Sequence, residues 1–356
     1  MTPEPAPAIA FIQLDAHTFA CAAGPLAPVA GPAPNGAAFL APHFSLDQRH
    51  AWWWAPGAAV RRVTRAEWHH DFPPVAPPLG PLCWEPPEEA RFRAGFDSLR
   101  ARLADGRLRK GVPITRMRAR LDSEEAEPLF RRLAARVPAL PGAVSAYGFY
   151  APASGGLGPE FLIGATPELL FEIAEDGCLR TSSVAGTRRA EPGAEAVLAG
   201  SAKDLAEHQA VVEDLLARTR RWGSPRLGAA RVQEFGGLLH LVTEIAVEPG
   251  VPPRFEDVVR ALHPTPALGV SPRGAEGDAW LREIDPAGER RRFGAPFGVR
   301  WPSGEGRAAV AIRGLQYFEG HVEIWAGCGV VGASEYEAEW SEILDKMHAV
   351  RTLWGV

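Results

Sequence analysis

The chain has 356 residues, of which 46% are hydrophobic and 23% are charged, and its formal net charge is −5 at pH 7. This length and composition indicate a folded protein with room for a large core, and they argue against intrinsic disorder. The acidic balance and the lack of a long lysine or arginine run argue against binding to nucleic acid or to anionic membranes, because phosphate contacts need a basic surface.

Residues 1–90 are rich in alanine, proline and glycine and predict short strands separated by turns. The three consecutive tryptophans at residues 52–54 could form a stacking platform. Structural packing is favoured, because no basic residues interleave with them. The proline-dense residues 73–87 predict a linker or a wrapped connection. A helix is predicted over residues 91–108, where apolar side chains recur at helical spacing, and it ends near Gly106.

Short apolar runs after residue 110 predict strands, and the segments between them predict helices. The predicted strands cover residues 112–121, 161–164, 169–173, 309–313 and 322–331, and the predicted helices cover residues 124–137, 203–222 and 255–262. Strands and helices do not alternate strictly, and no Gly-x-Gly-x-x-Gly motif follows a first strand, so a doubly wound nucleotide-binding fold is disfavoured. We expect an α+β fold with large, mostly antiparallel β-sheets in a layered core and helices packed outside.

The four cysteines, Cys21, Cys83, Cys178 and Cys328, are scattered and include no Cys-x-x-Cys pair. Their spacing predicts neither a zinc site nor a disulfide framework, and it fits a reducing compartment. No apolar run approaches the roughly 20 residues of a membrane-spanning helix, and no targeting segment is recognisable. We expect a cytoplasmic protein without a membrane anchor.

The most informative segment lies between residues 325 and 351. An apolar strand there runs into a Gly-x-Gly turn at Gly327 and Gly329. Ser334 and Glu337 follow with the spacing of a capping box, which predicts the start of a helix.

On this helix Glu339, Glu342 and Lys346 fall at positions i, i+3 and i+7, so two carboxylates and an ammonium share one face. Carboxylates that converge in a cleft repel each other, and the usual remedy is a hard cation such as Mg²⁺, which takes oxygen ligands. The alternative is a solvated helix face with one Glu/Lys pair.

Ser201 and Asp204 form a cap pair for a helix predicted over residues 201–222. Leu205 and the apolar residues that follow it at helical spacing form the predicted buried face. Glu207 lies at the edge of that face, where its carboxylate can point into a site. The alternative is an ordinary surface glutamate.

Glu168 follows Thr166 and Pro167, between two apolar runs. Desolvation of a glutamate fixed in apolar surroundings favours its neutral form, which suits a general acid near neutral pH. A solvated glutamate in a hairpin turn is the alternative.

Two further polar features are candidates for a carboxylate-binding site. Gly186 and Thr187 predict a turn whose backbone amides could hold a carboxylate, with Arg188 and Arg189 directly after it. His240 interrupts an apolar strand, and a lone histidine in that setting is more often a satisfied core residue than a site residue.

Two basic residues flank predicted strands. Arg313 ends the run AVAIR, and an arginine that emerges from a buried strand is well placed for bidentate binding of a carboxylate. Lys110 precedes the VPITR strand and is a candidate base only if its amine turns inward, because a solvated lysine stays protonated.

From Lys110 onward, about two thirds of the chain resembles the chorismate-utilising enzymes, the family of isochorismate synthase, anthranilate synthase component I, aminodeoxychorismate synthase and salicylate synthase. The motifs that carry the resemblance occur in the family's order: GATPELL, SVAGTRRA, SAKDLAEHQAVV, LLHLVTEI, LHPTPALG, AVAIRG and AGCGVVGASEYEAEWSEILDK. The resemblance implies a single chorismate-binding domain over residues 1–356, with the family's motifs in residues 110–351 and a divergent part in residues 1–90.

The resemblance also implies roles for the candidate residues. In such enzymes Mg²⁺ bridges acidic residues and a carboxylate of chorismate, and Glu207, Glu339 and Glu342 match those positions. Glu168 matches the acid that assists departure of the C4 hydroxyl. Other matches bind the substrate: Arg313 and the Gly327 backbone match the binders of the pyruvyl-ether carboxylate, and Gly186, Thr187, His240, Ala267 and Lys346 match further pocket positions.

Within the family, the chain is most similar to isochorismate synthase. Ala185 stands where aminodeoxychorismate synthases that form a covalent adduct carry a lysine, and the stretch HPTPALG at residues 263–269 resembles isochorismate synthase. In isochorismate synthases a lysine at the start of the strand that precedes the acid activates the water that attacks C2. Lys110 is the nearest match to that lysine, but its spacing to the next strand is one residue longer than usual. Gly111 could therefore occupy the position instead.

We expect an Mg²⁺-dependent enzyme that isomerises chorismate to isochorismate, adding water at C2 and losing the C4 hydroxyl. The product could serve menaquinone, siderophore or other biosynthesis, and a glutaminase partner is not expected. Two alternatives stay open. One is ammonia-dependent amination of chorismate with such a partner, and the other is a paralogue that binds chorismate without turnover.

Overall fold

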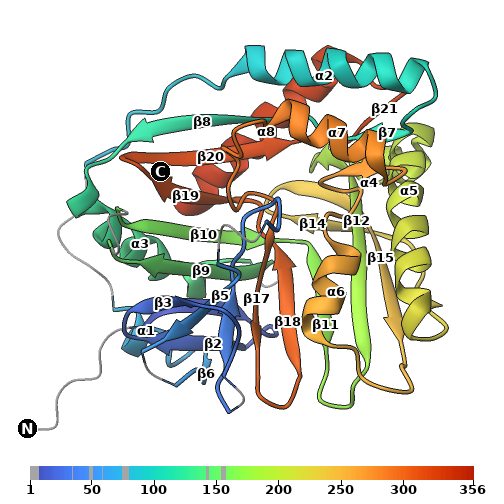
Figure 1. Ribbon diagram of the computed structural model, residues 1–356. Helices are drawn as coiled ribbons and strands as arrows, with labels where there is room; N and C mark the ends of the chain where they lie inside the picture. The colour runs from blue at the N-terminus through green and yellow to red at the C-terminus, as the bar shows by residue number, and fades with distance from the viewer. Residues whose placement is uncertain are drawn as a thin grey trace, which may run out of the picture.

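The computed structural model describes residues 8–33, 35–47, 51–57, 59–73, 80–141, 144–153 and 158–356. Two large β-sheets form its centre, and most helices lie around them (Figure 1). Within these ranges all the strand pairs of the two sheets are antiparallel. The predicted α+β fold with large antiparallel sheets is therefore confirmed.

The first sheet has eight strands and joins the N-terminal part to the C-terminal part. Its spatial order is β6 (Arg61–Thr64), β2 (Thr18–Ala23), β1 (Ala8–Gln13), β9 (Ser145–Ala151), β10 (Glu160–Thr166), β19 (Gly314–Phe318), β20 (His321–Gly327) and β8 (Ile114–Arg120).

The second sheet has ten strands, and a small third sheet lies beside the site described below. The second runs β13 (Arg226–Leu227), β15 (Leu238–Val247), β12 (Leu179–Arg189), β11 (Leu169–Ile173), β18 (Gly306–Val310), β17 (Pro296–Arg300), β4 (Ala38–Leu40), β5 (Trp53–Pro56) and β3 (Leu26–Val29), with β14 (Arg231–Phe235) also paired to β15. The third runs β16 (Val270–Ser271), β7 (Lys110–Gly111) and β21 (Val330–Val331).

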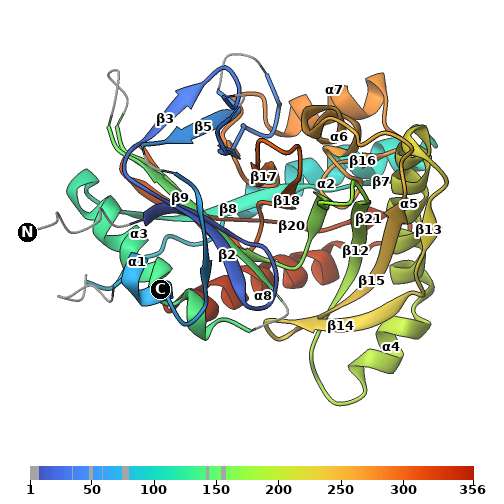
Figure 2. The same ribbon diagram turned by 90° about the horizontal axis from the view of Figure 1, so that it is seen from below.

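The helices cover the outer faces and edges of these sheets (Figures 1 and 2). They are α1 (Trp68–Asp71), α2 (Glu89–Ala104), α3 (Ala126–Ala134), α4 (Ala194–Gly200), α5 (Ala202–Thr219), α6 (Phe255–Leu262), α7 (Ala275–Ile284) and α8 (Tyr336–Trp354), with 3₁₀ turns at Ser123–Glu125, Val137–Ala139 and Arg220–Trp222. Helix α5 packs on β12 and β15, and α8 packs on β20. None of the described helices is long and apolar enough to cross a membrane.

Local sequence explains where several elements form. In α6, Phe255, Val258, Val259 and Leu262 are buried at the i, i+3, i+4 and i+7 spacing of an amphipathic helix. Strand β10 is buried along nearly its whole length, which accounts for its continuous apolar run instead of an alternating one.

The N-terminal part belongs to both large sheets, because β1, β2 and β6 extend the first sheet and β3, β4 and β5 extend the second. Trp52, Trp53 and Trp54 are buried, so the prediction of structural packing is confirmed. Residues 74–79 of the predicted linker lie outside the described residues. The part that follows wraps along β8, where Trp84 bridges to Ala119.

Three local predictions were wrong. The described contacts of α8 include no side-chain cap at its first turn, because Ser334 instead accepts a hydrogen bond from the Val331 amide at 3.1 Å. Leu205, which was predicted to lie on the buried face of α5, is 42% exposed. The buried face instead includes Asp204 and His208. Arg313 does not end a strand: β18 stops at Val310, and Arg313 lies in the turn before β19 with φ of 58°.

The close approach of β17 to β18 predicts that Gly298→Ala destabilises the fold. A Cβ at this position would lie 2.3 Å from the Arg307 carbonyl oxygen and 2.9 Å from Ala308 Cα, both backbone atoms that cannot rotate away. Overpacking of this kind costs about 1 to 3 kcal/mol, so the apparent melting temperature should fall.

Gly250→Ala is the matched control, because no described heavy atom lies within 4 Å of a Cβ there. Equal melting temperatures for the two variants in a thermal scan would contradict the strand packing.

Candidate active site

A small pocket with a volume of about 60 Å³ lies between the two large sheets. Larger hollows open to solvent elsewhere on the surface, but the titratable groups of the sequence motifs converge on this one. Its walls come from the β10–β11 turn, β12, β15, β20, α5, α8 and nearby loops. The lining residues are Pro167, Glu168, Val184, Ala185, Gly186, Thr187, Glu207, His240, Ala267, Leu268, Phe293, Ile312, Arg313, Trp325, Ala326, Gly327, Gly329, Lys346 and Val350.

Lys110 lies directly behind this lining, in β7. Its side chain is fully buried, and its Nζ lies 3.1 Å from Glu207 Oε1, a contact held by charge instead of a well-aligned hydrogen bond. Gly111 faces the other way, because a Cβ there would lie 2.8 Å from Leu99 in α2. Gly329 packs directly against this ion pair, because a Cβ on it would lie 1.9 Å from Glu207 Oε1. The side chain that reaches the site is therefore that of Lys110, not a substituent at Gly111.

The two carboxylates on α8 are each paired with a lysine. Glu339 is fully buried, and its Oε1 lies 2.5 Å from the Nζ of Lys203 in α5. Glu342 Oε1 lies 2.5 Å from the Nζ of Lys346, one turn along the same helix. Lys346 also donates a hydrogen bond of 2.8 Å to the Gly327 carbonyl, which ties α8 to the end of β20.

Lys203 lies among all three acidic residues. Burial alone would lower the pKa of Lys203, but the surrounding carboxylates of Glu339, Glu342 and Glu207 raise it above its ordinary value. The pKa of Glu339 is raised, by burial first and then by Glu342, while Lys203 and Ser334 oppose the rise. The three carboxylates thus all lie in the neighbourhood of the Lys203 ammonium.

These residues have the donor chemistry that a hard divalent cation requires. Glu339 Oε2 is buried and has no hydrogen-bond partner among the described residues, and Glu342 is near enough to repel it. Within the described ranges no group of three His, Cys, Asp or Glu side chains is arranged to hold a metal ion, and each of the three carboxylates contacts a lysine instead. A cation fits the site only if the lysines move away from these carboxylates.

Glu168 is held in the tight connection between β10 and β11 and is only 3% exposed. Burial raises its pKa to about 7, and a hydrogen bond of 3.2 Å from the Thr265 hydroxyl limits the rise. The cationic groups of Lys110, Lys346 and Arg313 act in the same direction as Thr265. A carboxyl in this setting exchanges a proton near neutral pH, as a general acid must.

Arg313 and Lys346 form the cationic wall of the pocket, and the Arg313 guanidinium contacts a neutral histidine, His240. The guanidinium Nη2 of Arg313 lies 3.1 Å from His240 Nε2, and His240 Nδ1 lies 3.2 Å from the Gly186 carbonyl and 3.1 Å from Thr187 Oγ1. Burial, Arg313 and Lys346 hold the pKa of His240 well below its ordinary value. The neutral ring therefore accepts from Arg313 through Nε2 and carries its proton on Nδ1, an assignment made from these partners.

Arg313 is half-buried, and its desolvation lowers its pKa to about 10 against the opposing charges of Glu342 and Glu168. A desolvated guanidinium that has no carboxylate partner among the described residues is well suited to bind one from a ligand. Arg188 and Arg189, which follow the Gly186–Thr187 turn, point toward solvent: Arg188 lies 3.9 Å from Asp204 and Arg189 lies 3.7 Å from Asp345.

The structure brings most sequence-predicted site residues to one pocket. Lys110, Glu339 and Glu342 do not line it directly; Lys110 lies behind Glu207, and Glu342 lines an adjoining hollow together with Lys203. Sequence reasoning missed Lys203, although it lies four residues before Glu207 on the same helix, a spacing that could have found it.

Two other contributors were also missed. Thr265 contacts Glu168 from a distant loop, and Trp325 lines the pocket from β20. Neither contact has a local sequence signal, because each joins segments far apart in the chain.

Comparison with known proteins adds to this geometry. The family model of chorismate binding enzymes matches residues 41–352. Anthranilate synthase component 1 of Streptomyces coelicolor is 29% identical over 274 residues, which cover 74% of this chain and 51% of that protein. Isochorismate synthase EntC of Escherichia coli is 32% identical over 241 residues, which cover 64% of this chain and 57% of that protein. The chain thus spans a little over half the length of these curated relatives.

The fold has close counterparts among solved structures. DhbC of Bacillus anthracis, assigned as a 2,3-dihydroxybenzoate-specific isochorismate synthase, superposes with a TM-score of 0.79 at 22% identity, over 98% of this chain and 96% of that one. This likeness concerns the fold. The family match over most of the chain shows that the protein belongs to the chorismate binding enzyme family.

Proposed function

We propose that the protein is an Mg²⁺-dependent isochorismate synthase. The observation that carries the proposal is the fully buried ammonium of Lys110 beside Glu207, in the same site as Glu168, whose pKa lies near neutrality. A candidate base and a candidate acid are thereby present together. The similarity to EntC supports the same choice.

The cationic wall suits a substrate with two carboxylates. Arg313 and Lys346 supply positive charge inside the pocket, and Gly327 and Gly186 bring backbone close to the ligand without a side chain in the way. Charge-assisted contacts of this kind fix orientation as well as affinity. Chorismate, a dicarboxylate, matches this arrangement.

Glu168 is the proposed acid. In its protonated form it donates a proton to the C4 hydroxyl, which leaves as water when the C4–O bond breaks. The ring double bonds shift, and a bond forms between C2 and the oxygen of the incoming water. One water enters and one leaves, so the product is an isomer of the substrate.

Lys110 is the proposed base that takes a proton from the incoming water. In this structure the amine contacts Glu207, so its role as a base requires that Glu207 be engaged by another cation. Lys203 is near enough to Glu207 to contribute such charge.

Glu207, Glu339 and Glu342 would hold Mg²⁺, which neutralises clustered carboxylates and polarises substrate oxygens when it is bound. Lys203 contacts Glu339 in this structure and would have to leave that carboxylate for a cation to bind it.

Amination of chorismate is the second candidate, because the Streptomyces coelicolor relative is an anthranilate synthase component. Isotope labelling separates the two. Incubation with chorismate and Mg²⁺ in ¹⁸O-water should give an isomer that carries one ¹⁸O, with or without ammonium and with no glutaminase partner. An amino product formed only with ammonium would overturn the proposal.

Lys110→Ala should lower kcat by about 10²- to 10⁴-fold, the usual contribution of a general base, while chorismate still binds. Loss of the amine removes the proton acceptor but not the cationic wall of Arg313 and Lys346. Calorimetry of chorismate binding and initial-rate kinetics test the two parts separately. Wild-type turnover in this variant would show that the base lies elsewhere.

Turnover should fall as pH rises above about 7, because only the protonated form of Glu168 can donate a proton and its pKa is about 7. Thr265→Val removes a hydrogen bond that favours the carboxylate, so the pKa rises and the alkaline limb of the pH–kcat profile moves to higher pH. Thr265→Ser keeps the hydroxyl and is the control. An unmoved limb in Thr265→Val would assign this limb to another group.

Direct titration with Mg²⁺ tests the cation site. Glu339→Gln should weaken Mg²⁺ binding by about tenfold or more, a loss of about 1.4 kcal/mol, since one anionic ligand is lost. Lys203→Met should strengthen it, because the competing ammonium is gone.

Glu337→Gln on the exposed side of the same helix should leave Mg²⁺ affinity unchanged. Unaltered affinity in Glu339→Gln as well would place the cation elsewhere.

A further inference from the structure

We infer that Trp325 is the wall against which the substrate ring packs and that Glu323, which does not line the pocket, is the positioning residue that fixes this wall. The inference rests on the pocket being the chorismate site, as proposed above, but not on the identity of the nucleophile. Trp325 lines the pocket beside Phe293 and Leu268.

The indole is held by a specific hydrogen bond. Trp325 and Glu323 lie two residues apart in β20 and so point to the same face of the sheet. Trp325 Nε1 donates to Glu323 Oε2 at 2.8 Å, and Gln316, directly opposite Glu323 in β19, donates to the same oxygen at 3.2 Å. Both side chains of β20 are buried, so water does not compete strongly for these bonds.

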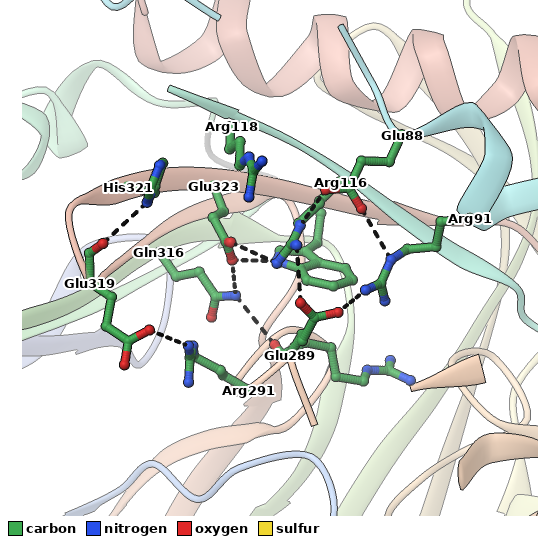
Figure 3. A network of polar contacts seen from close by, with 12 residues as sticks. Glu88, Arg91, Arg116, Arg118, Glu289, Arg291, Gln316, Glu319, His321 and Glu323 are labelled. Carbon is green, nitrogen blue, oxygen red and sulfur yellow. Dashed lines mark hydrogen bonds and ion pairs between the residues drawn. The ribbon is translucent and has the colours of Figure 1, made fainter. Parts of the chain in front are cut away.

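The other oxygen of Glu323 is held by an ion pair. Arg116, opposite Trp325 in the neighbouring strand β8, donates from Nη1 to Glu323 Oε1 at 2.9 Å. Figure 3 shows Arg116 reaching three carboxylates at once, since it also donates to Glu88 at 2.9 Å and to Glu289 at 3.1 Å. All of its donor nitrogens therefore have fixed partners.

A second arginine closes the network. Arg91 of α2 pairs with Glu88 at 3.1 Å and with Glu289, so the two arginines and two glutamates form a closed ring of ion pairs (Figure 3). The guanidinium carbons of Arg91 and Arg116 each lie 5.2 Å from the centre of the Trp325 ring, within the range of cation–π attraction.

The pocket side of the indole completes the wall. Phe293 stacks on Trp325 with ring centres 6.1 Å apart and planes 24° apart. The polar groups of the pocket can fix the carboxylates of a ligand, whereas a flat apolar surface is what its ring needs. Trp325 supplies that surface. Its orientation is set by Glu323, whose buried carboxylate cannot move without leaving the Arg116 guanidinium unpaired.

A double-mutant cycle on chorismate affinity tests the inference, with dissociation constants measured by calorimetry for Trp325→Phe, Glu323→Gln and the double variant. Each single change should weaken binding by about fivefold to tenfold, because the ring at position 325 is then no longer held in one orientation by the Nε1–Glu323 hydrogen bond. If Glu323 acts through the indole, the double variant should bind no more weakly than the weaker single variant. Additive losses, or unchanged affinity in either single variant, would overturn the inference.

Matched controls separate positioning from stability. Glu85→Gln removes the partner of Arg118 in an exposed ion pair on the same strand β8, and it should leave chorismate affinity unchanged. Trp325→Phe keeps an apolar ring and the Glu323–Arg116 ion pair, so it remains informative if Glu323→Gln fails to fold. Failure of the proposed reaction would appear as a different product with normal binding, whereas failure of this inference would appear as normal binding in Trp325→Phe.

Discussion

The buried ion pair between Lys110 and Glu207 is the contact on which the site depends. Burial of an ammonium costs free energy unless a carboxylate pairs with it. Here the carboxylate is that of Glu207, which belongs to another element, α5. The pair can exist only where Gly329 leaves room, because any side chain there would overlap Glu207. One charge interaction thus joins β7, α5 and the turn before β21.

The other carboxylates of the predicted cation site are also paired with lysines. Glu339 and Glu342 are each answered by a lysine, and Lys203 lies within reach of all three carboxylates. Glu168 differs from them: burial dominates its surroundings, and it holds a proton near neutral pH instead of a permanent charge. The site therefore contains carboxylates of two kinds, one suited to cations and one suited to proton transfer.

The two large sheets give the pocket its rigidity. The second sheet and α5 supply the turn with Gly186, His240 and Glu207, while β20 of the first sheet supplies Trp325 and Gly327. His240 is held within the lining by its contact with Arg313, and Trp325 is held from behind by Glu323 and the Arg116 network. A ligand in this pocket meets surfaces whose orientation is set before it arrives, which lowers the entropic cost of binding.

The amino-acid sequence by itself determined the α+β class, the bounds of α6 and β11, the Ser201 cap of α5 and most members of the site, because these follow from local periodicity and from motifs whose order survives in the chain. Only the tertiary structure decided that Lys110 and not Gly111 faces the site, that Ser334 does not cap α8, and that Arg313 lies in a turn. It also revealed Lys203, Thr265 and the Glu323–Trp325 contact. The physical reason is that burial and charge pairing depend on residues distant in the chain, and no local pattern records which of them meet.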